Sequence, residues 1–189
     1  RTACEVFQVA PGDLNDELRR QAKAINFGII YGMSAFGLSR QLEISQQMAK
    51  TYIDHYFERY QGVKRFMDQT IGDARETRRT STLLGRMRLL PDINSGNHIV
   101  RQAAERTAIN TPIQGSAADL IKVAMIRVDE VLRQKGLQSG MLLSVHDELV
   151  FEVPPEELQE CSRLIRDIME GVWALKVPLK INLAKGRNW

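Results

Sequence analysis

Apolar residues recur at helical spacing through the first half of the chain, and side chains that favour helix starts precede them. Asp13 or Asn15 can cap a helix that runs to about Tyr31, and Ser45 can cap a second one. A third helix is expected over residues 63–79. The pattern after the first helix is broken by glycines at positions 28, 32 and 37. These features predict helices joined by short turns.

The pattern changes in the middle of the chain. Residues 80–91 predict two short strands around a glycine. A basic and polar helix is expected over 97–110, and Pro112 and Gly115 should kink or interrupt it. A helix with a continuous apolar stripe then resumes and ends near Gly136.

The last part of the chain has a strand pattern. Residues 141–145 and 149–153 are strand-like and flank the tripeptide His-Asp-Glu at 146–148. An amphipathic helix opens at the prolines 154–155, and residues 177–183 alternate like a half-buried strand. The predicted fold class is therefore α+β, with helices on one face of an antiparallel sheet.

Composition adds limits. The chain has 189 residues, 43% of them apolar and 26% charged, which is ordinary for a globular protein of one domain or two small ones. No apolar run approaches the ~18 residues that a membrane span needs, so we expect no membrane partner. Cys4 and Cys161 show neither metal spacing nor a disulfide framework, which fits a reducing, cytoplasmic location.

Charge and the first residue change the picture slightly. A net charge of +3 permits a nucleic-acid partner without requiring one. The chain starts with Arg1 and has no leader pattern, so we expect it to begin inside a longer gene product or to be processed.

The first candidate site is a stripe of Arg19, Lys23, Phe27 and Tyr31, each four residues after the last. Because four residues advance a helix by slightly more than one turn, all four side chains share one face. Two cations could hold a polyphosphate, and two aromatic rings could stack on a sugar and a base. The alternative is a solvated basic face that continues into a core aromatic pair.

The second candidate is His146-Asp147-Glu148, between two apolar strands. Hairpin turns usually use Asn-Gly or Asp-Gly, so adjacent carboxylates here break a local rule, as functional sites often do. A carboxylate on a rigid hairpin tip is a suitable Mg²⁺ ligand. The alternative is a polar turn in which Asp tolerates a strained φ.

A third set, Arg106, Asn110 and Gln114, is also spaced by four and can hydrogen-bond to a duplex, or it can be a solvated helix face. A concentrated basic segment is weaker support for phosphate binding, and it consists of Arg75, Arg78, Arg79, Arg86 and Arg88.

Four stretches together resemble a known family. Residues 19–32 closely resemble motif B of family A DNA polymerases, the bacterial DNA polymerase I type, and residues 145–150 are similar to their motif C. Residues 84–93 and 110–119 also match, in the family's order and spacing. The resemblance covers the whole chain. It implies a template-directed DNA polymerase with helical fingers over 1–96 and part of a palm over 97–189.

The resemblance also implies roles for residues. Arg19 and Lys23 would bind the incoming deoxynucleoside triphosphate (dNTP), with Lys23 also catalytic, and Phe27 would pack on its sugar. Asp147 would bind one of the two Mg²⁺ ions of the complete enzyme, with Glu148 assisting in catalysis. Tyr31 would stack near the templating base, with Gly32 as a pivot. Contacts with primer–template DNA are implied for Tyr31, Gly32, Arg106, Asn110, Gln114 and His146.

One family motif has no counterpart. Motif A, which carries the other metal-binding Asp, lies upstream of residue 1 in the family, as do the thumb and any exonuclease domain. We therefore expect a fragment that is inactive alone and that self-associates through an exposed sheet edge. A non-catalytic DNA-binding module is the alternative. A metal-dependent phosphohydrolase is disfavoured because His55 and His98 lack ligand spacing.

Overall fold

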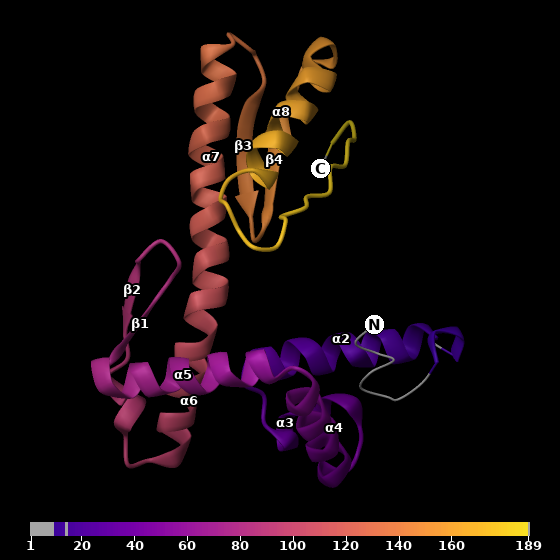
Figure 1. The fold of residues 1–189 in the computed structure, drawn as a ribbon. Helices are drawn as coiled ribbons and strands as arrows, with labels where there is room; N and C mark the ends of the chain where they lie inside the picture. The colour runs from indigo at the N-terminus through magenta and orange to yellow at the C-terminus, as the bar shows by residue number, and fades with distance from the viewer. Residues whose placement is uncertain (1–9, 14, 189) are drawn as a thin grey trace. The chain divides into compact units, whose positions relative to one another are not determined.

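The computed structural model describes residues 10–13 and 15–188. The chain forms two compact units, Arg1–Ile113 and Gln114–Trp189, which are described separately. Figure 1 shows the elements of each, from indigo at the N-terminus to yellow at the C-terminus. The assignment of fingers to 1–96 and palm to 97–189 stays a prediction.

The described part of the first unit begins with a short 3₁₀ turn, Pro11–Asp13, and three helices, α2 (Asp16–Ile30), α3 (Ala35–Leu42) and α4 (Gln46–Arg59). Asn15 caps α2, since its side-chain oxygen accepts a hydrogen bond from the Leu18 N–H at 2.8 Å. Ser45 caps α4 in the same way, through the N–H of Met48. Both predicted helix starts are confirmed.

Helix α3 was not expected from the sequence. Ser34 caps it by accepting a hydrogen bond from the Gly37 N–H, and Glu43 ends it in a left-handed conformation at φ 55°. Gly37 suggests a break, but it lies in the first turn of the helix, where the serine cap compensates for its low helix propensity.

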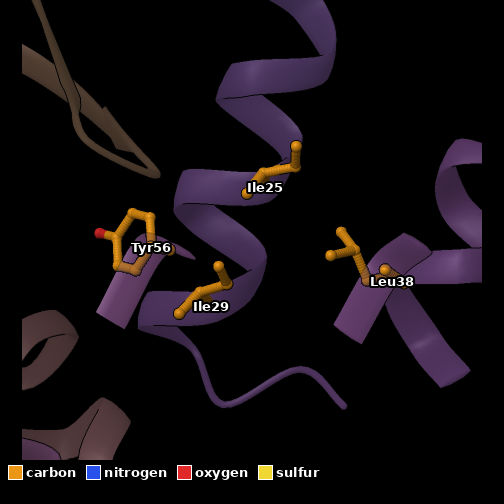
Figure 2. Packing of buried hydrophobic residues seen from close by; sticks show 5 residues of the cluster. Ile25, Ile29, Leu38 and Tyr56 are labelled. Carbon is orange, nitrogen blue, oxygen red and sulfur yellow. The ribbon is translucent and has the colours of Figure 1, made fainter. Parts of the chain in front are cut away.

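A hydrophobic core joins these three helices (Figure 2). Ile25 and Ile29 on α2 meet Leu38 on α3 and Tyr56 on α4, and all four side chains are almost completely buried. The Tyr56 hydroxyl donates a hydrogen bond to Asn26 Oδ1 at 2.8 Å. Burial of the ring, and then the nearby Tyr60, raises the pKa of Tyr56. This core fixes which face of α2 remains free.

The rest of the first unit consists of α5 (Gln61–Thr77), a two-stranded antiparallel sheet, a 3₁₀ turn and α6 (His98–Asn110). The strands β1 (Arg79–Ser81) and β2 (Met87–Leu89) confirm the predicted hairpin. Ala74, Leu90, Ile93, Ala104 and Ala108 form a second core between these elements.

The α-helix is interrupted around Pro112 and Gly115, as the sequence predicts. Thr111–Gly115 form a π-helical turn that leads from α6 into α7 (Ser116–Gln134). A π turn tolerates a proline more easily than an α turn does, because its wider hydrogen-bond pattern already displaces local backbone pairing.

The second unit contains α7, the strands β3 (Gly140–Val145) and β4 (Glu148–Glu152), a 3₁₀ turn at Pro155–Glu157, and α8 (Leu158–Glu170). Its core is formed by Val128, Leu132, Cys161 and Ile165, with Met141 and Phe151 of the hairpin packed against it. The β3–β4 pairing has a bulge between Met141 and Leu143, so Leu142 has no partner opposite it.

A carboxylate ties the start of the hairpin to the turn before α8. Glu157 accepts hydrogen bonds from the backbone N–H groups of Gln138 and Ser139, both at 2.9 Å, and from the Ser139 hydroxyl at 2.6 Å. The hydroxyl and then the Gln138 N–H are the main causes that lower the pKa of Glu157. We call this arrangement the Glu157 clamp.

The strand predicted over 177–183 is wrong, because this segment has no regular secondary structure. The Ile181 N–H donates to Glu170 Oε1 at 3.1 Å rather than to a strand, and Pro178 has no N–H to donate. Leu179 and Ile181 are half-buried as the alternation indicates, whereas Val177 is 71% exposed. No helix in the described part of the chain has the length and apolar character that crossing a membrane requires.

Candidate functional site

Helix α2 has a buried face and a free face. Ile25 and Ile29 point into the core, as Figure 2 shows. Lys23, Phe27 and Tyr31 lie two positions away from these isoleucines, about half a turn around the helix. The stripe predicted from sequence is therefore not part of the core, and its side chains are available to a ligand.

The free face of α2 lines a pocket of ≈ 640 Å³, which we call the α2 pocket. It lies within the first unit, between side chains of α2, α3 and α6 and the turn that joins α2 to α3. Its lining consists of Arg20, Lys23, Ala24, Phe27, Gly28, Tyr31, Gly32, Met33, Ser34, Gly37, Gln41 and Arg106. Cations and aromatic rings thus share one hollow of nucleotide size.

The aromatic residues of the pocket form a flat apolar platform. The Phe27 and Tyr31 rings are stacked, with centroids 6.2 Å apart and planes at 22°. Phe27 is 45% exposed, so part of its ring is accessible from the pocket. Lys23 Nζ lies 6.0 Å from the Phe27 centroid, at the outer limit of a cation–π contact. A negative charge at Lys23 would therefore sit beside a surface suited to a sugar and a base.

Gly32 lies at the point where α2 ends, with φ of +75°. A Cβ there would lie 3.1 Å from Arg106 Cγ, so this close approach and the left-handed backbone both favour glycine. The small residue lets α6 bring Arg106 into the pocket lining. The predicted pivot motion of Gly32 is not tested by this geometry.

The structure distinguishes two neighbouring arginines. Arg19 is exposed and lies 4.0 Å from Asp16 Oδ1, and it is not part of the pocket lining. Arg20 lines the pocket instead, as does Gln41 from α3, and neither was singled out from the sequence. The position of Gln41 depends on α3, which the sequence did not predict, so no sequence signal pointed to it.

The predicted set of Arg106, Asn110 and Gln114 is divided. Arg106 lies in the α2 pocket, while Asn110 is half-buried on the same helix. Asn110 Oδ1 is fully buried and has no hydrogen-bond partner among the described residues. Gln114 is exposed in the π turn and belongs to the second unit. Only Arg106 thus joins the nucleotide-like pocket.

His146 and Asp147 form the two-residue turn of the β3–β4 hairpin, since Val145 pairs with Glu148. His146 has φ of +55°, so the strained residue is the histidine rather than the aspartate expected from turn preferences. The side chains of His146, Asp147 and Glu148 are all exposed. The strand pairing imposes this left-handed backbone and places two adjacent carboxylates, Asp147 and Glu148, at the end of the hairpin.

The basic segment is partly neutralised. Arg75 forms an ion pair with Glu105 at 2.6 Å, and Arg78 donates to the Pro91 carbonyl at 3.5 Å. Arg88 is exposed on β2. A hollow of ≈ 430 Å³ beside this hairpin also contains Asp73, whose carboxylate opposes phosphate binding. This segment therefore adds little to the candidate site.

The donor atoms at the hairpin tip match a divalent metal in part. Asp147 and Glu148 offer hard carboxylate oxygens, the ligands that Mg²⁺ prefers. Within residues 10–13 and 15–188, however, no three His, Cys, Asp or Glu side chains come together as a metal site. The hairpin can supply one part of a metal site, and further ligands must come from elsewhere.

These features define an α+β protein with a cationic and aromatic pocket on α2, and the comparisons with known proteins identify its family. The chain belongs to DNA polymerase family A, whose family model matches residues 1–189. The predicted family and fold class are confirmed.

Named relatives are similar over the whole chain. DNA polymerase I from Bacillus subtilis is 48% identical over 189 residues, and that from Streptococcus pneumoniae is 51% identical; each match covers 100% of this chain and 22% of the relative. The chain thus spans about a fifth of the length of these relatives. The POL domain of Pol1 from M. smegmatis, solved in complex with DNA primer-template and dNTP, superposes with a TM-score of 0.91 at 48% identity, over 95% of this chain and 32% of that one.

Proposed function

We propose that this chain is the part of a bacterial DNA polymerase that binds the incoming dNTP and contributes to template-directed nucleotidyl transfer to a primer 3′ hydroxyl. The observation that carries the proposal is the α2 pocket, which combines Lys23, Phe27, Tyr31 and Arg106 in one hollow. Membership of the family and the similarity to a polymerase domain bound to primer-template and dNTP support it. The location would be the cytoplasm, at the nucleoid.

In this proposal the positive end of the stripe neutralises the triphosphate. Arg19 and Lys23 contact its oxygens, with Arg20 placed to add a third cation from the pocket lining. Lys23 also stabilises the charge that develops during transfer, which makes it catalytic as well as binding. Phe27 packs on the sugar and Tyr31 stacks near the templating base.

DNA contacts come from polar side chains that the pocket does not use for phosphates. Arg106, Asn110 and Gln114 hydrogen-bond to the primer–template duplex, and His146 lies near the primer end.

Asp147 would hold Mg²⁺, with Glu148 assisting beside it. When bound, a pair of Mg²⁺ ions activates the primer hydroxyl and stabilises the pyrophosphate leaving group. Because the described residues supply only part of such a site, we propose that the chain alone does not extend a primer. A carboxylate from outside the described residues has to complete the site.

The first experiment measures binding of dATP to the 189-residue chain by isothermal titration calorimetry with Mg²⁺. Lys23→Ala should weaken binding roughly 10- to 100-fold, because a hydrogen bond to a charged group contributes about 1.5–3 kcal/mol. Lys50→Ala is the matched control, since Lys50 is exposed on α4 and outside the pocket. Equal loss in both variants, or no binding by the wild type, would contradict the proposal.

Primer extension separates catalysis from binding. A folded chain given primed template, four dNTPs and Mg²⁺ should bind DNA but not extend the primer. Extension that disappears in Lys23→Ala would show that the chain carries a complete metal site after all. Mg²⁺-independent DNA binding that is unaffected by dNTP would favour the alternative, a non-catalytic DNA-binding module.

Self-association through the β3–β4 sheet belongs to the same proposal. Among the described residues this sheet has two strands, so each strand has one unpaired edge. Light scattering over a range of protein concentrations measures the molar mass, and a monomer at every concentration would contradict this part.

A further inference from the structure

Residues 171–188 form an irregular segment whose charged side chains are all positive (yellow in Figure 1). The segment contains no Asp or Glu, and its four cations are Lys176, Lys180, Lys185 and Arg187. The formal net charge of the whole chain is +3, so these four charges exceed the net positive charge of the protein. We call residues 171–188 the cationic segment. Such a concentration of one sign of charge favours an anionic partner.

All four cations are exposed, and none of them forms an ion pair or a side-chain hydrogen bond with another described residue. Other basic side chains of the same unit are neutralised within the chain. Arg133 on α7 pairs with Asp129 at 3.0 Å. Lys135, which follows α7, pairs with Glu160 at 2.8 Å. Within the described part of the chain, the cations of the segment thus have no internal anion that competes with an external one.

The core of the second unit holds the backbone of the segment. Leu175 and Leu179 pack against the buried cluster that contains Val172. Between these contacts and the end of α8, the Ile181 N–H donates a hydrogen bond to Glu170 Oε1 at 3.1 Å. Each of the two leucines is followed directly by a lysine. Because this backbone is already ordered, its cations lose less conformational entropy on binding than those of a disordered tail.

We infer that the cationic segment binds the phosphate backbone of double-stranded DNA, without regard to sequence and separately from the α2 pocket. The choice of DNA as the polyanion rests on the proposed function. Lysine and arginine contact phosphate oxygens without reading the bases. Proteins that bind single strands add aromatic rings on which the bases stack, and residues 174–188 contain no aromatic side chain. The duplex is therefore favoured over a single strand.

The test measures binding of the 189-residue chain to a blunt DNA duplex by fluorescence anisotropy at several salt concentrations. Each phosphate contact contributes about 0.9 to the slope of log affinity against log salt concentration. The double variant Lys180→Ala, Lys185→Ala should therefore reduce the magnitude of this slope by about 1.8. Between about 50 and 200 mM salt, the ratio of wild-type to variant affinity should fall roughly tenfold. Two duplexes of unrelated sequence should give the same result.

The matched control is the double variant Arg133→Ala, Lys135→Ala. It changes the net charge of the same unit by the same amount, but it removes cations that are already paired with carboxylates. Its slope should change by less than half as much. Since all four replaced side chains are exposed and surface ion pairs contribute little to stability, both variants should remain folded.

Several results would overturn the inference. An equal change of slope in the two double variants would trace the effect to net charge rather than to contacts at the segment. Tighter binding to a single strand of the same length, with the same loss in Lys180→Ala, Lys185→Ala, would contradict the preference for a duplex. Equally tight binding to phosphatidylserine vesicles, with that same loss, would assign the segment to anionic surfaces in general.

Binding of dATP separates this inference from the proposed function. The affinity of Lys180→Ala, Lys185→Ala for dATP should equal that of the wild type, because neither lysine lines the α2 pocket. A wild type that binds dATP but shows the same duplex slope as this variant would refute the role of the cationic segment alone. A wild type that binds neither dATP nor the duplex would refute the proposed function as well.

Discussion

Replacing Ile25 by alanine should weaken the packing of α2 against its core and lower the free energy of unfolding. It changes no side chain on the face of the helix that lines the pocket. Ile25 is 0% exposed and contacts the cluster formed by α2, α3 and α4. The substitution removes three carbon atoms, each contributing about 0.8 kcal/mol of transfer free energy. The cavity left behind adds to this, for a total loss of about 3–4 kcal/mol in the free energy of unfolding. For a chain of this size, that corresponds to a decrease of about 10 °C in melting temperature.

Spectroscopy can assign this loss to the correct unit. All of the tyrosines lie before residue 61, in the first unit, and both tryptophans lie in the second. Urea unfolding followed by tyrosine absorbance therefore reports on the core that contains Ile25, and tryptophan fluorescence reports on the second unit. The tyrosine-detected midpoint should fall, and dATP affinity should fall with it, because the free face of α2 is positioned by its buried face.

Ile99→Ala is the matched control. Ile99 is on α6 in the same unit and is 76% exposed, so removing the same three carbon atoms should change the unfolding free energy by less than about 0.5 kcal/mol. If both variants lowered the tyrosine-detected midpoint equally, the packing of α2 against α3 and α4 described above would be refuted.

Three further perturbations test single contacts. Tyr56→Phe removes the hydrogen bond to Asn26 and should cost about 1 kcal/mol in urea unfolding. Glu157→Gln should lower the free energy of unfolding at neutral pH. The hydrogen bonds of the clamp, mainly the one from Ser139, lower the pKa of Glu157 below its ordinary 4.5, so the carboxylate stabilises the fold fully above pH 4.5 and loses this effect as the pH falls through the lowered pKa. Wild type and variant should therefore have the same stability in acid. His146→Gly should relieve the left-handed backbone strain and raise the free energy of unfolding by up to about 1 kcal/mol. The same variant should bind primer–template DNA more weakly in fluorescence anisotropy. A lower stability would show that the histidine is not strained.

Local signals predicted most of the helices correctly. Asn15 and Ser45 form the hydrogen bonds that their sequence context indicates, because a cap depends only on residues within one turn. Helix α3 was missed because it is short and contains Gly37, a poor helix former that suggests a break. In the structure the cap at Ser34 outweighs the low helix propensity of this glycine.

Features that depend on distant partners were harder to predict. The alternation over 177–183 predicts a strand, but a strand needs a pairing edge, and Glu170 takes the Ile181 N–H instead. The helical spacing correctly places Lys23, Phe27 and Tyr31 on one face of α2, where they line the pocket, and their roles stay a prediction. The place of Gln41 in the lining follows from how α3 folds against α2. Helical spacing predicts which residues share a face of the helix. Tertiary packing determines which residues at the edge of that face contribute to the pocket.

The bulge at Leu142 has a consequence for the turn that carries Asp147. In a regular two-stranded ribbon, a slip of one residue exchanges the two faces and moves the turn along the sequence. Here the bulge adds Leu142 to β3, so a slip of the pairing would also have to move the bulge. Met141 and Phe151 would then leave the core that α7 and α8 provide. The bulge thus acts as a register lock, and His146 and Asp147 remain the turn residues even though neither is the glycine that such a turn prefers.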